Sequence, residues 1–218
     1  MQISTFNINK FCGAYSYRGW YKNPRNLDFR TPIKEIVDSV LSSESDIIFL
    51  QEFTNNEEID AEKLFSDDKY CIFHNKKLTL KSGVVAITLK NSLWSIDTKY
   101  SSNKLLGMKY KREDIELKAI GFHNTMDSIK DIINQAISAG ETDIVLGDFN
   151  DTDWLDSLSS QENGYTSLIS KDQITYKPAQ TTIDGVFIKK NLNNKIGSKA
   201  VQHTFASDHN IVTFTLSI

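Results

Sequence analysis

The apolar positions of the chain follow two patterns, which predict strands that alternate with helices. Short continuous apolar runs at residues 47–50 and 144–146 are typical of buried strands, and residues 3–6 are also expected to form a short strand. In residues 33–41 and 129–137, apolar side chains return every three to four positions, which predicts two helices. Further strands are expected at 70–73, 83–89, 93–100, 115–121, 183–188 and 210–216. The order of these elements indicates a mixed α/β sandwich with antiparallel neighbours in each half.

No internal repeat, low-complexity tract or Pro/Gly/Ser-rich linker divides the sequence, so we expect a single domain over residues 1–218. A short acidic helix that reaches Leu64 is expected to be capped by Asn55 or Asn56. The region around Trp154 is expected to be rich in loops.

Composition mainly excludes other classes of protein. Hydrophobic residues make up 39% of the 218-residue chain and charged residues 24%, as in ordinary folded proteins. The two cysteines, Cys12 and Cys71, are too few for a disulfide framework and lack metal-ligand spacing. We find neither a signal-peptide pattern nor an apolar run long enough to span a membrane. The expectation is a cytoplasmic monomer; no protein partner is indicated.

Basic residues gather in two segments, although the net charge of the chain is −3. Residues 10–30 contain five basic side chains and one acid, and residues 99–112 contain five basic side chains and no acid. Such segments can bind a polyanion locally in a mildly acidic chain. For residues 99–112 we expect mainly a solvated run of charge, with contact to a nucleic-acid backbone as the alternative.

Polar residues recur where the predicted strands end: Asn7, Asn9, Glu52, His123, Asp148, Asn150, Asp184, Asp208 and His209. Carboxylate and amide oxygens are hard ligands that favour Mg²⁺ or Mn²⁺ over zinc. In an extended segment, Asp148 and Asn150 would share one side of the strand and Phe149 would face the other. The segment after residue 146 is also rich in turn formers, and a simple β-turn is the alternative.

Together these pieces resemble the endonuclease/exonuclease/phosphatase family, which includes pancreatic-type DNases, abasic-site endonucleases and inositol-polyphosphate 5-phosphatases. The matching pieces, in family order, are Phe6-Asn7-Ile8-Asn9, Leu50-Gln51-Glu52, His123, Gly147-Asp148-Phe149-Asn150, Ile183-Asp184 and Ser207-Asp208-His209. The resemblance runs over residues 3–216. It implies a four-layer α/β sandwich, with two packed β-sheets flanked by helices, and a metal-dependent hydrolase of phosphoesters.

The resemblance also implies a metal site and a residue that handles the attacking water. Glu52 would be the principal ligand of Mg²⁺ or Mn²⁺, assisted by Asn7 and Asp208. Asp148 would orient or deprotonate the water. Asn150 would hold the phosphate or position Asp148.

Two histidines would meet the substrate phosphate. His209 would contact the scissile phosphate, while Asp184 fixes its tautomer and favours its charged form. His123 matches a position that touches the phosphate or serves as an acid, and a purely structural histidine is the alternative. Family members of the DNase type give this histidine an acidic partner, for which only Glu113 and Glu116 are candidates here. Thr182 stands where some members have a basic residue.

The loop after Asn9 is the best indication of the substrate, because it combines aromatic and basic side chains. Asn9, Arg18, Trp20 and Lys22 are expected to bind substrate by phosphate contact and base stacking. Aromatic side chains that merely cover the core are the alternative. The leading hypothesis is a sequence-nonspecific nuclease, with DNA favoured over RNA. The alternatives are a phosphatase or phosphodiesterase for a small or lipid-linked phosphate, and an inactive binding protein on the same fold.

Overall fold

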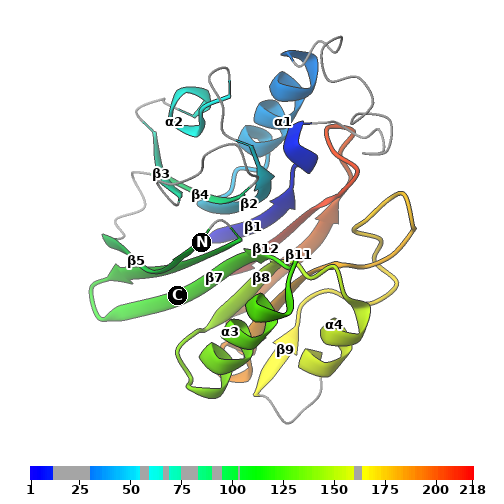
Figure 1. Cartoon of the computed structure of the whole chain (residues 1–218). Coiled ribbons are helices and arrows are strands. Elements are labelled where there is room, and N and C mark those ends of the chain that lie inside the picture. Colours follow the sequence, from blue (N-terminus) through cyan, green and yellow to red (C-terminus); the bar gives the residue numbers. More distant parts are fainter. Residues whose placement is uncertain are drawn as a thin grey trace.

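Two six-stranded β-sheets face each other, and helices cover their outer faces (Figure 1). The computed structural model describes residues 1–11, 30–54, 59–65, 69–74, 83–89, 95–102, 104–159 and 164–218. The layers run from α1 and α2 through the two sheets to α3 and α4. The predicted four-layer α/β sandwich is therefore confirmed.

The first sheet has the strand order β11-β12-β1-β2-β4-β3. Its strands are β1 (Gln2–Asn7), β2 (Ile47–Phe53), β3 (Tyr70–His74), β4 (Gly83–Leu89), β11 (Ile196–Gln202) and β12 (Ile211–Leu216). The central pair β1 and β2 is parallel, with Asn7 opposite Gln51, and the other neighbours are antiparallel.

The second sheet repeats this arrangement with the order β5-β6-β7-β8-β10-β9. Its strands are β5 (Ser95–Ser102), β6 (Leu105–Arg112), β7 (Ile115–His123), β8 (Ile144–Asp148), β9 (Tyr165–Ser167) and β10 (Asp184–Lys189). Again only the central pair, β7 and β8, is parallel, and His123 lies opposite Asp148. Asp148 also lies opposite Asp184 of the antiparallel β10.

The helices connect and flank these strands. They are α1 (Arg30–Ser42), α2 (Ala61–Leu64), α3 (Asp127–Ser138) and α4 (Thr152–Ser159), with 3₁₀ turns η1 (Asn9–Phe11) and η5 (Lys190–Lys195). Helices α1 and α3 each join the two strands of a parallel pair, as such crossovers require.

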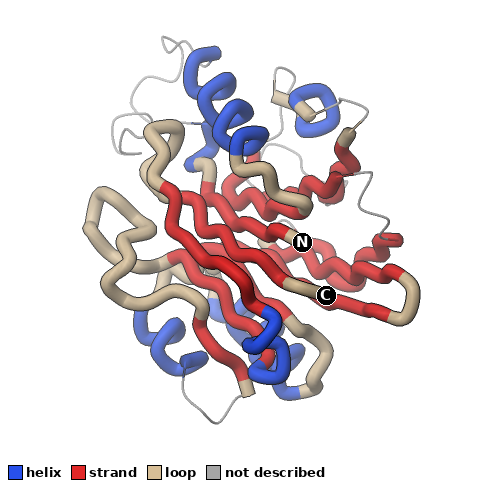
Figure 2. Tube along the Cα trace, turned by 180° about the vertical axis from the view of Figure 1, so that it is seen from behind, coloured by secondary structure: helices blue, strands red, loops and turns tan. Residues whose placement is uncertain are grey.

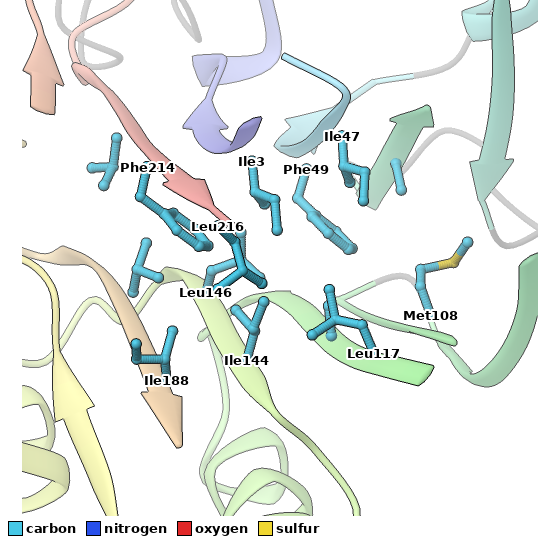
Figure 3. Packing of buried hydrophobic residues seen from close by; sticks show 14 of the residues in the cluster. Ile3, Ile47, Phe49, Met108, Leu117, Ile144, Leu146, Ile188, Phe214 and Leu216 are labelled. Carbon is cyan, nitrogen blue, oxygen red and sulfur yellow. The ribbon is translucent and has the colours of Figure 1, made fainter. Parts of the chain in front are cut away.

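The continuous apolar runs are explained by burial on both faces of each sheet. In β2, Ile47 and Phe49 point into the core between the sheets, and Ile48 and Leu50 point toward α1 and α2. Figure 3 shows the core between the sheets, where side chains such as Phe214 of one sheet and Leu146 of the other meet. A strand with two buried faces has no polar alternation, which is why it reads as a short apolar block.

Several sequence predictions are confirmed, and three local ones are wrong. The helices expected at 33–41 and 129–137 lie within α1 and α3. The short acidic helix begins at Ala61 and is capped by the side chain of Asp60, not by Asn55 or Asn56, which lie outside the described residues. The region around Trp154 forms α4 instead of a loop.

The third error concerns residues 99–112, which were expected to be a run of charge. Beyond β5, which lies close to the strand expected at 93–100, residues 105–112 form strand β6, which was not expected. Leu106, Met108 and Tyr110 are buried in the core between the sheets, while Lys109 and Lys111 alternate with them. Because successive side chains of a strand point to opposite faces, the apolar side chains of β6 can be buried while its lysines lie on the other face.

The two chain ends lie side by side at one end of the sandwich, as Figure 2 shows from behind. The amino group of Met1 donates a hydrogen bond to the carbonyl oxygen of Leu216 at 2.9 Å. Because β1 runs away from Met1 and β12 runs toward Leu216, Asn7 and His209 lie at the opposite end. Among the described residues, no helix is long and apolar enough to cross a membrane.

Candidate active site

Three contacts between side chains of opposite sheets build a polar site at the end of the sandwich away from the termini. They join Asn7 to Asp148, Glu52 to His123, and Asp184 to His209. All of these residues were predicted to be functional, and each comes from the end of a strand or the segment next to it. The close approach follows from the packing of β1 and β2 against β8 and β7.

Asp148 is an enclosed carboxylate of the site, with only 2% of its side chain exposed, as for Asp184. One oxygen accepts a hydrogen bond from Asn7 Nδ2 at 2.7 Å, and the other accepts one from the backbone N–H of Asn150 at 2.9 Å. Burial, and then the negative charge of Asp184, raise the pKa of Asp148 to about 7. The carboxyl can therefore exchange a proton close to neutral pH.

Glycine at position 147 allows this close packing. Its φ is +146°, and a Cβ atom there would lie 2.0 Å from the carbonyl oxygen of Phe122. A larger residue would push β8 away from β7 and move Asp148 out of the site.

Asn150 does not point into the site beside Asp148, so the extended geometry predicted for this segment is wrong. Strand β8 ends at Asp148, and Asn150 has a left-handed φ of +50°. The Asn150 side chain is exposed, and its Nδ2 donates to the carbonyl oxygen of Asn124 at 3.1 Å. Asn150 instead supports Asp148 through its backbone N–H, which donates a hydrogen bond to the Asp148 carboxylate. Phe149 is buried, as expected, with its ring 4.7 Å from that of Phe122.

His209 and Asp184 form a buried pair with Nδ1 and Oδ2 2.8 Å apart. Burial opposes a charge on His209, but the charge and hydrogen bond of Asp184, together with the charges of Asp148 and Asp208, outweigh this and raise the pKa of His209 to about 9. The histidine is therefore protonated at neutral pH. Asp184 Oδ1 is buried and has no hydrogen-bond partner in the described part of the chain.

Two residues that the sequence did not indicate fix this pair. Thr175 Oγ1 accepts the backbone N–H groups of Ile183 and Asp184 at 3.0 and 2.9 Å, which orients the start of β10. The ring of Tyr176 lies 4.9 Å from that of His209. Neither residue belongs to a local pattern, and their contacts are made only in the folded chain.

Lys177 is the third residue whose role the sequence did not indicate. Its hydrogen bonds hold the loop that precedes His209 in place. Its ammonium group donates to the carbonyl oxygens of Thr204, at 2.5 Å, and Ser207. Burial lowers the pKa of Lys177. Ser207 Oγ in turn donates to the carbonyl oxygen of Asn7 at 2.8 Å. The pinned loop holds Phe205 outward with 93% of its surface exposed.

Glu52 and His123 form the opposite corner, with Oε1 and Nε2 3.3 Å apart. Glu52 has a left-handed φ of +56°, which is uncommon outside glycine. Burial, followed by the positive charge of Lys104, lowers the pKa of His123 to about 3, so this histidine is neutral at neutral pH. Lys104 Nζ lies 3.2 Å from His123 Nδ1.

Neither candidate acid partner of His123 is found beside it. Glu116 forms ion pairs with Lys109 at 2.7 Å and Lys118 at 3.4 Å. Glu113 lies between β6 and β7 with a left-handed φ of +54°. Lys104, and neither of these two acids, therefore lies beside Nδ1 of His123.

The turn after β1 places Asn9 and Lys10 at the Glu52 corner. The buried Asn9 donates its backbone N–H to Asn7 Oδ1 at 2.9 Å, so its visible role is to shape this turn. Lys10 Nζ lies 3.5 Å from Glu52 Oε2. The other expected substrate-binding residues, Arg18, Trp20 and Lys22, lie outside the described residues.

The donor set fits a hard divalent cation. Burial raises the pKa of Asp208, and the negative charge of Glu52 raises it further, so the predicted ligands Glu52 and Asp208 repel each other in the absence of a cation. A second group, Asp148, Asp184 and His209, has potential ligand atoms within 4.8 Å of one another. However, His209 binds metals only as a neutral imidazole, and its pairing with Asp184 favours the protonated form.

A cavity of about 260 Å³ adjoins Asp184. It is lined by helix α4, by Lys171 and by the segment that precedes β10, including Thr181 and Thr182. Thr182, where some family members have a basic residue, donates its hydroxyl to the carbonyl oxygens of Lys171 and Gln173 at 2.9 and 2.7 Å.

Comparison with known proteins agrees with this fold. The family model described as "Endonuclease/Exonuclease/phosphatase family" matches residues 4–209. No curated protein is similar enough in sequence to match the chain.

Solved structures share the fold at low sequence identity. The endonuclease domain of TRAS1, a telomere-specific non-LTR retrotransposon, has a TM-score of 0.69 at 14% identity, with 100% of this chain and 98% of that chain covered. The TDP2 of D. rerio, complexed with a single-strand DNA product, has a TM-score of 0.70 at 14% identity, covering 100% and 99%. A 3'-5' exonuclease from Neisseria meningitidis has a TM-score of 0.64 at 14% identity and full coverage of both chains.

Proposed function

Because the chain belongs to the endonuclease/exonuclease/phosphatase family, we propose that it hydrolyses phosphodiesters with the help of Mg²⁺ or Mn²⁺. We further propose that its substrate is a nucleic acid, cut without sequence preference, with DNA favoured over RNA. The proposal rests mainly on three contacts between side chains of opposite sheets at one end of the sandwich. They join Asn7 to Asp148, Glu52 to His123, and Asp184 to His209.

Asp148 activates the water. Its carboxylate is held in one orientation by Asn7 and by the backbone N–H of Asn150, so that it can accept a proton from a water molecule in line with the scissile phosphorus–oxygen bond. The attack forms a bond from the water oxygen to phosphorus and breaks the bond to the leaving oxygen. The leaving oxygen takes a proton from solvent, and Asp148 returns to solvent the proton that it accepted from the water.

His209 holds the phosphate. Because Nδ1 is bonded to Asp184, Nε2 is the nitrogen that remains to donate to a non-bridging phosphate oxygen. Its positive charge stabilises the negative charge that develops during attack. The neutral His123 supplies hydrogen bonding at the other side of the phosphate.

Glu52, Asn7 and Asp208 would hold the divalent cation, which supplies stabilisation of charge on the phosphate when it is bound. These residues offer oxygen donors only, as Mg²⁺ and Mn²⁺ prefer. Glu52 is chosen over the buried group of Asp148, Asp184 and His209 because its side chain is 17% exposed, whereas those of Asp148 and Asp184 are only 2% exposed.

The exposed ring of Phe205 supports a polymeric substrate. It lies in a pinned loop only three residues before Asp208, where a nucleobase next to the scissile phosphate can stack on it. The D. rerio relative was solved with a single-strand DNA product, and the TRAS1 relative is an endonuclease domain. These relatives support DNA for this chain.

The cavity beside Asp184 favours a second candidate. Its volume of about 260 Å³ suits a small phosphorylated molecule, so a phosphatase or phosphodiesterase of that kind is the alternative function. An inactive binding protein is disfavoured, because Glu52, Asp148, Asp184 and His209 are all present and meet in the fold.

The test is to incubate the protein with supercoiled plasmid, linear DNA and RNA, in Mg²⁺ or Mn²⁺ and in EDTA. We expect metal-dependent cutting that His209→Ala reduces by about 100-fold or more. His203→Ala, which removes an exposed histidine, is the matched control and should cut normally.

A small chromogenic phosphodiester separates the two candidates. If the protein is a nuclease, Phe205→Ala should raise KM for DNA and leave hydrolysis of the small diester unchanged. Hydrolysis of small phosphates without cutting of any polymer would instead establish the alternative.

A further inference from the structure

The turn between β1 and the segment that follows it has an unusual backbone. Asn9, Lys10 and Phe11 have φ values of +46°, +52° and +63°, which are left-handed in all three cases. Residues other than glycine adopt this region infrequently, and a run of three is rarer still. The surrounding structure must hold the turn in place.

Contacts on both sides of the turn do so. Phe11 is fully buried and packs edge-to-face on Phe53, with ring centroids 5.1 Å apart. Its N–H donates to the carbonyl oxygen of Ile8 at 3.0 Å, and the Ile8 N–H donates to that of Gln51 at 3.1 Å. The backbone of Lys10 is therefore fixed with respect to the end of β2, which carries Glu52.

The ammonium group of Lys10 meets Glu52 at the corner of the site that Glu52 forms with His123. Nζ is 3.5 Å from Glu52 Oε2, while Glu52 Oε1 faces His123 Nε2 at 3.3 Å. The side chains of Lys10 and Glu52 are 26% and 17% exposed, so the pair is largely screened from water but still accessible. The positive charge of Lys10 is also one of the causes that lower the pKa of His123.

We propose that Lys10 is a resident cation that shares Glu52 with the divalent metal and then binds the substrate. In the metal-free protein, Lys10 neutralises Glu52. When Mg²⁺ or Mn²⁺ binds to Glu52, repulsion moves the ammonium group away, and its flexible four-carbon stem lets it reach a non-bridging oxygen of the phosphodiester. Lys10 thus weakens metal binding and strengthens substrate binding. This inference rests on the proposed function, since it assigns the metal to Glu52.

The test measures metal affinity directly, without turnover. Mn²⁺ is titrated calorimetrically into the wild-type protein and into Lys10→Met. Loss of one neighbouring positive charge should tighten Mn²⁺ binding by roughly 3- to 10-fold. Lys10→Arg keeps the charge and should stay close to the wild type. Lys34→Met removes an equal charge from an exposed ion pair with Asp38 in α1, and it should change nothing.

A second variant guards against disturbance of the turn. Lys10→Gly removes the ammonium group and readily adopts a positive φ, so it should fold at least as well as the wild type and bind Mn²⁺ with the same increased affinity. In turnover assays, Lys10→Met and Lys10→Gly should both raise KM for the phosphodiester several-fold.

The outcomes separate this inference from the proposed function. Equal Mn²⁺ affinity in the wild type, Lys10→Met and Lys10→Gly would overturn the role of Lys10 and leave the hydrolase proposal standing. Weaker binding in both variants would also overturn it. Absence of Mn²⁺ binding by the folded wild-type protein would overturn the metal part of the proposed function itself.

Discussion

The two sheets are built from the same unit, and the chemistry of the site depends on how the units differ. In the described residues, β1-α1-β2-α2-β3-β4 and β7-α3-β8-α4-β9-β10 follow the same order along the chain. Their strands also occupy the same places in their sheets. In each unit, the parallel pair ends at the site.

Equivalent strands end in different side chains. The first strand of each pair ends in Asn7 in one unit and in His123 in the other, and the second carries Glu52 or Asp148. The contacts cross between units, because Asn7 bonds Asp148 and His123 meets Glu52.

The carboxylates of Glu52 and Asp148, which the second strand of each pair carries, differ in their exposure and in their neighbours. The Glu52 side chain is 17% exposed and lies beside the ammonium group of Lys10, whereas that of Asp148 is 2% exposed and lies beside a neutral amide. An open carboxylate that already attracts a cation suits a metal, and an enclosed one suits proton transfer. One framework therefore supplies two carboxylates with separate tasks.

The largest expected effect comes from Asp148→Asn. This change keeps the shape of the side chain but removes the proton acceptor, so turnover should fall by about 1000-fold. Single-turnover cleavage of a labelled oligonucleotide measures it. A loss of less than 10-fold would mean that another group takes the proton.

Smaller losses of turnover are expected from changes at Asn7 and His123, the residues that end the first strand of the parallel pair in each unit. Asn7→Ala removes the hydrogen bond that orients Asp148 and a predicted metal ligand, so it should lower turnover by about 10- to 100-fold. His123→Ala removes a neutral group and should cost less than Asn7→Ala. Parallel assays of the two variants compare them, and the reverse order would contradict the division of tasks between the units.

The smallest effect is expected from Glu116→Gln. The carboxylate pairs with Lys109 and Lys118 on β6 and β7, away from His123, so turnover should be unchanged. A substantial loss would restore Glu116 as a candidate partner of His123.

The sequence predicted the buried strands well because burial on both faces leaves an unmistakable apolar block. Helix α4 was missed, since Thr152–Ser159 is short and places only three apolar side chains among polar ones. Strand β5 lies close to the strand expected at 93–100, but strand β6 was missed because its lysines outweighed the alternation of Leu106, Met108 and Tyr110.

Site residues were predictable where they lie at or next to the terminus of a strand, as Glu52, Asp148 and Asp184 do. Those that depend on long-range contacts were not. Lys104 reaches His123, and Lys177 holds the loop around Ser207, through partners 19 and 30 residues away. No local pattern specifies such contacts. The left-handed φ that turns Asn150 out of the site instead agrees with the turn that was kept as the alternative for this segment.

The most direct test of the division between the two units is a Mn²⁺ titration of Glu52→Gln and Asp148→Asn, with unfolding curves to verify that both variants fold. The account predicts that Glu52→Gln loses most of its Mn²⁺ affinity, while Asp148→Asn binds Mn²⁺ like the wild type and yet fails to cut DNA. Loss of Mn²⁺ binding by Asp148→Asn, with Glu52→Gln unaffected, would contradict it and place the metal among Asp148, Asp184 and His209.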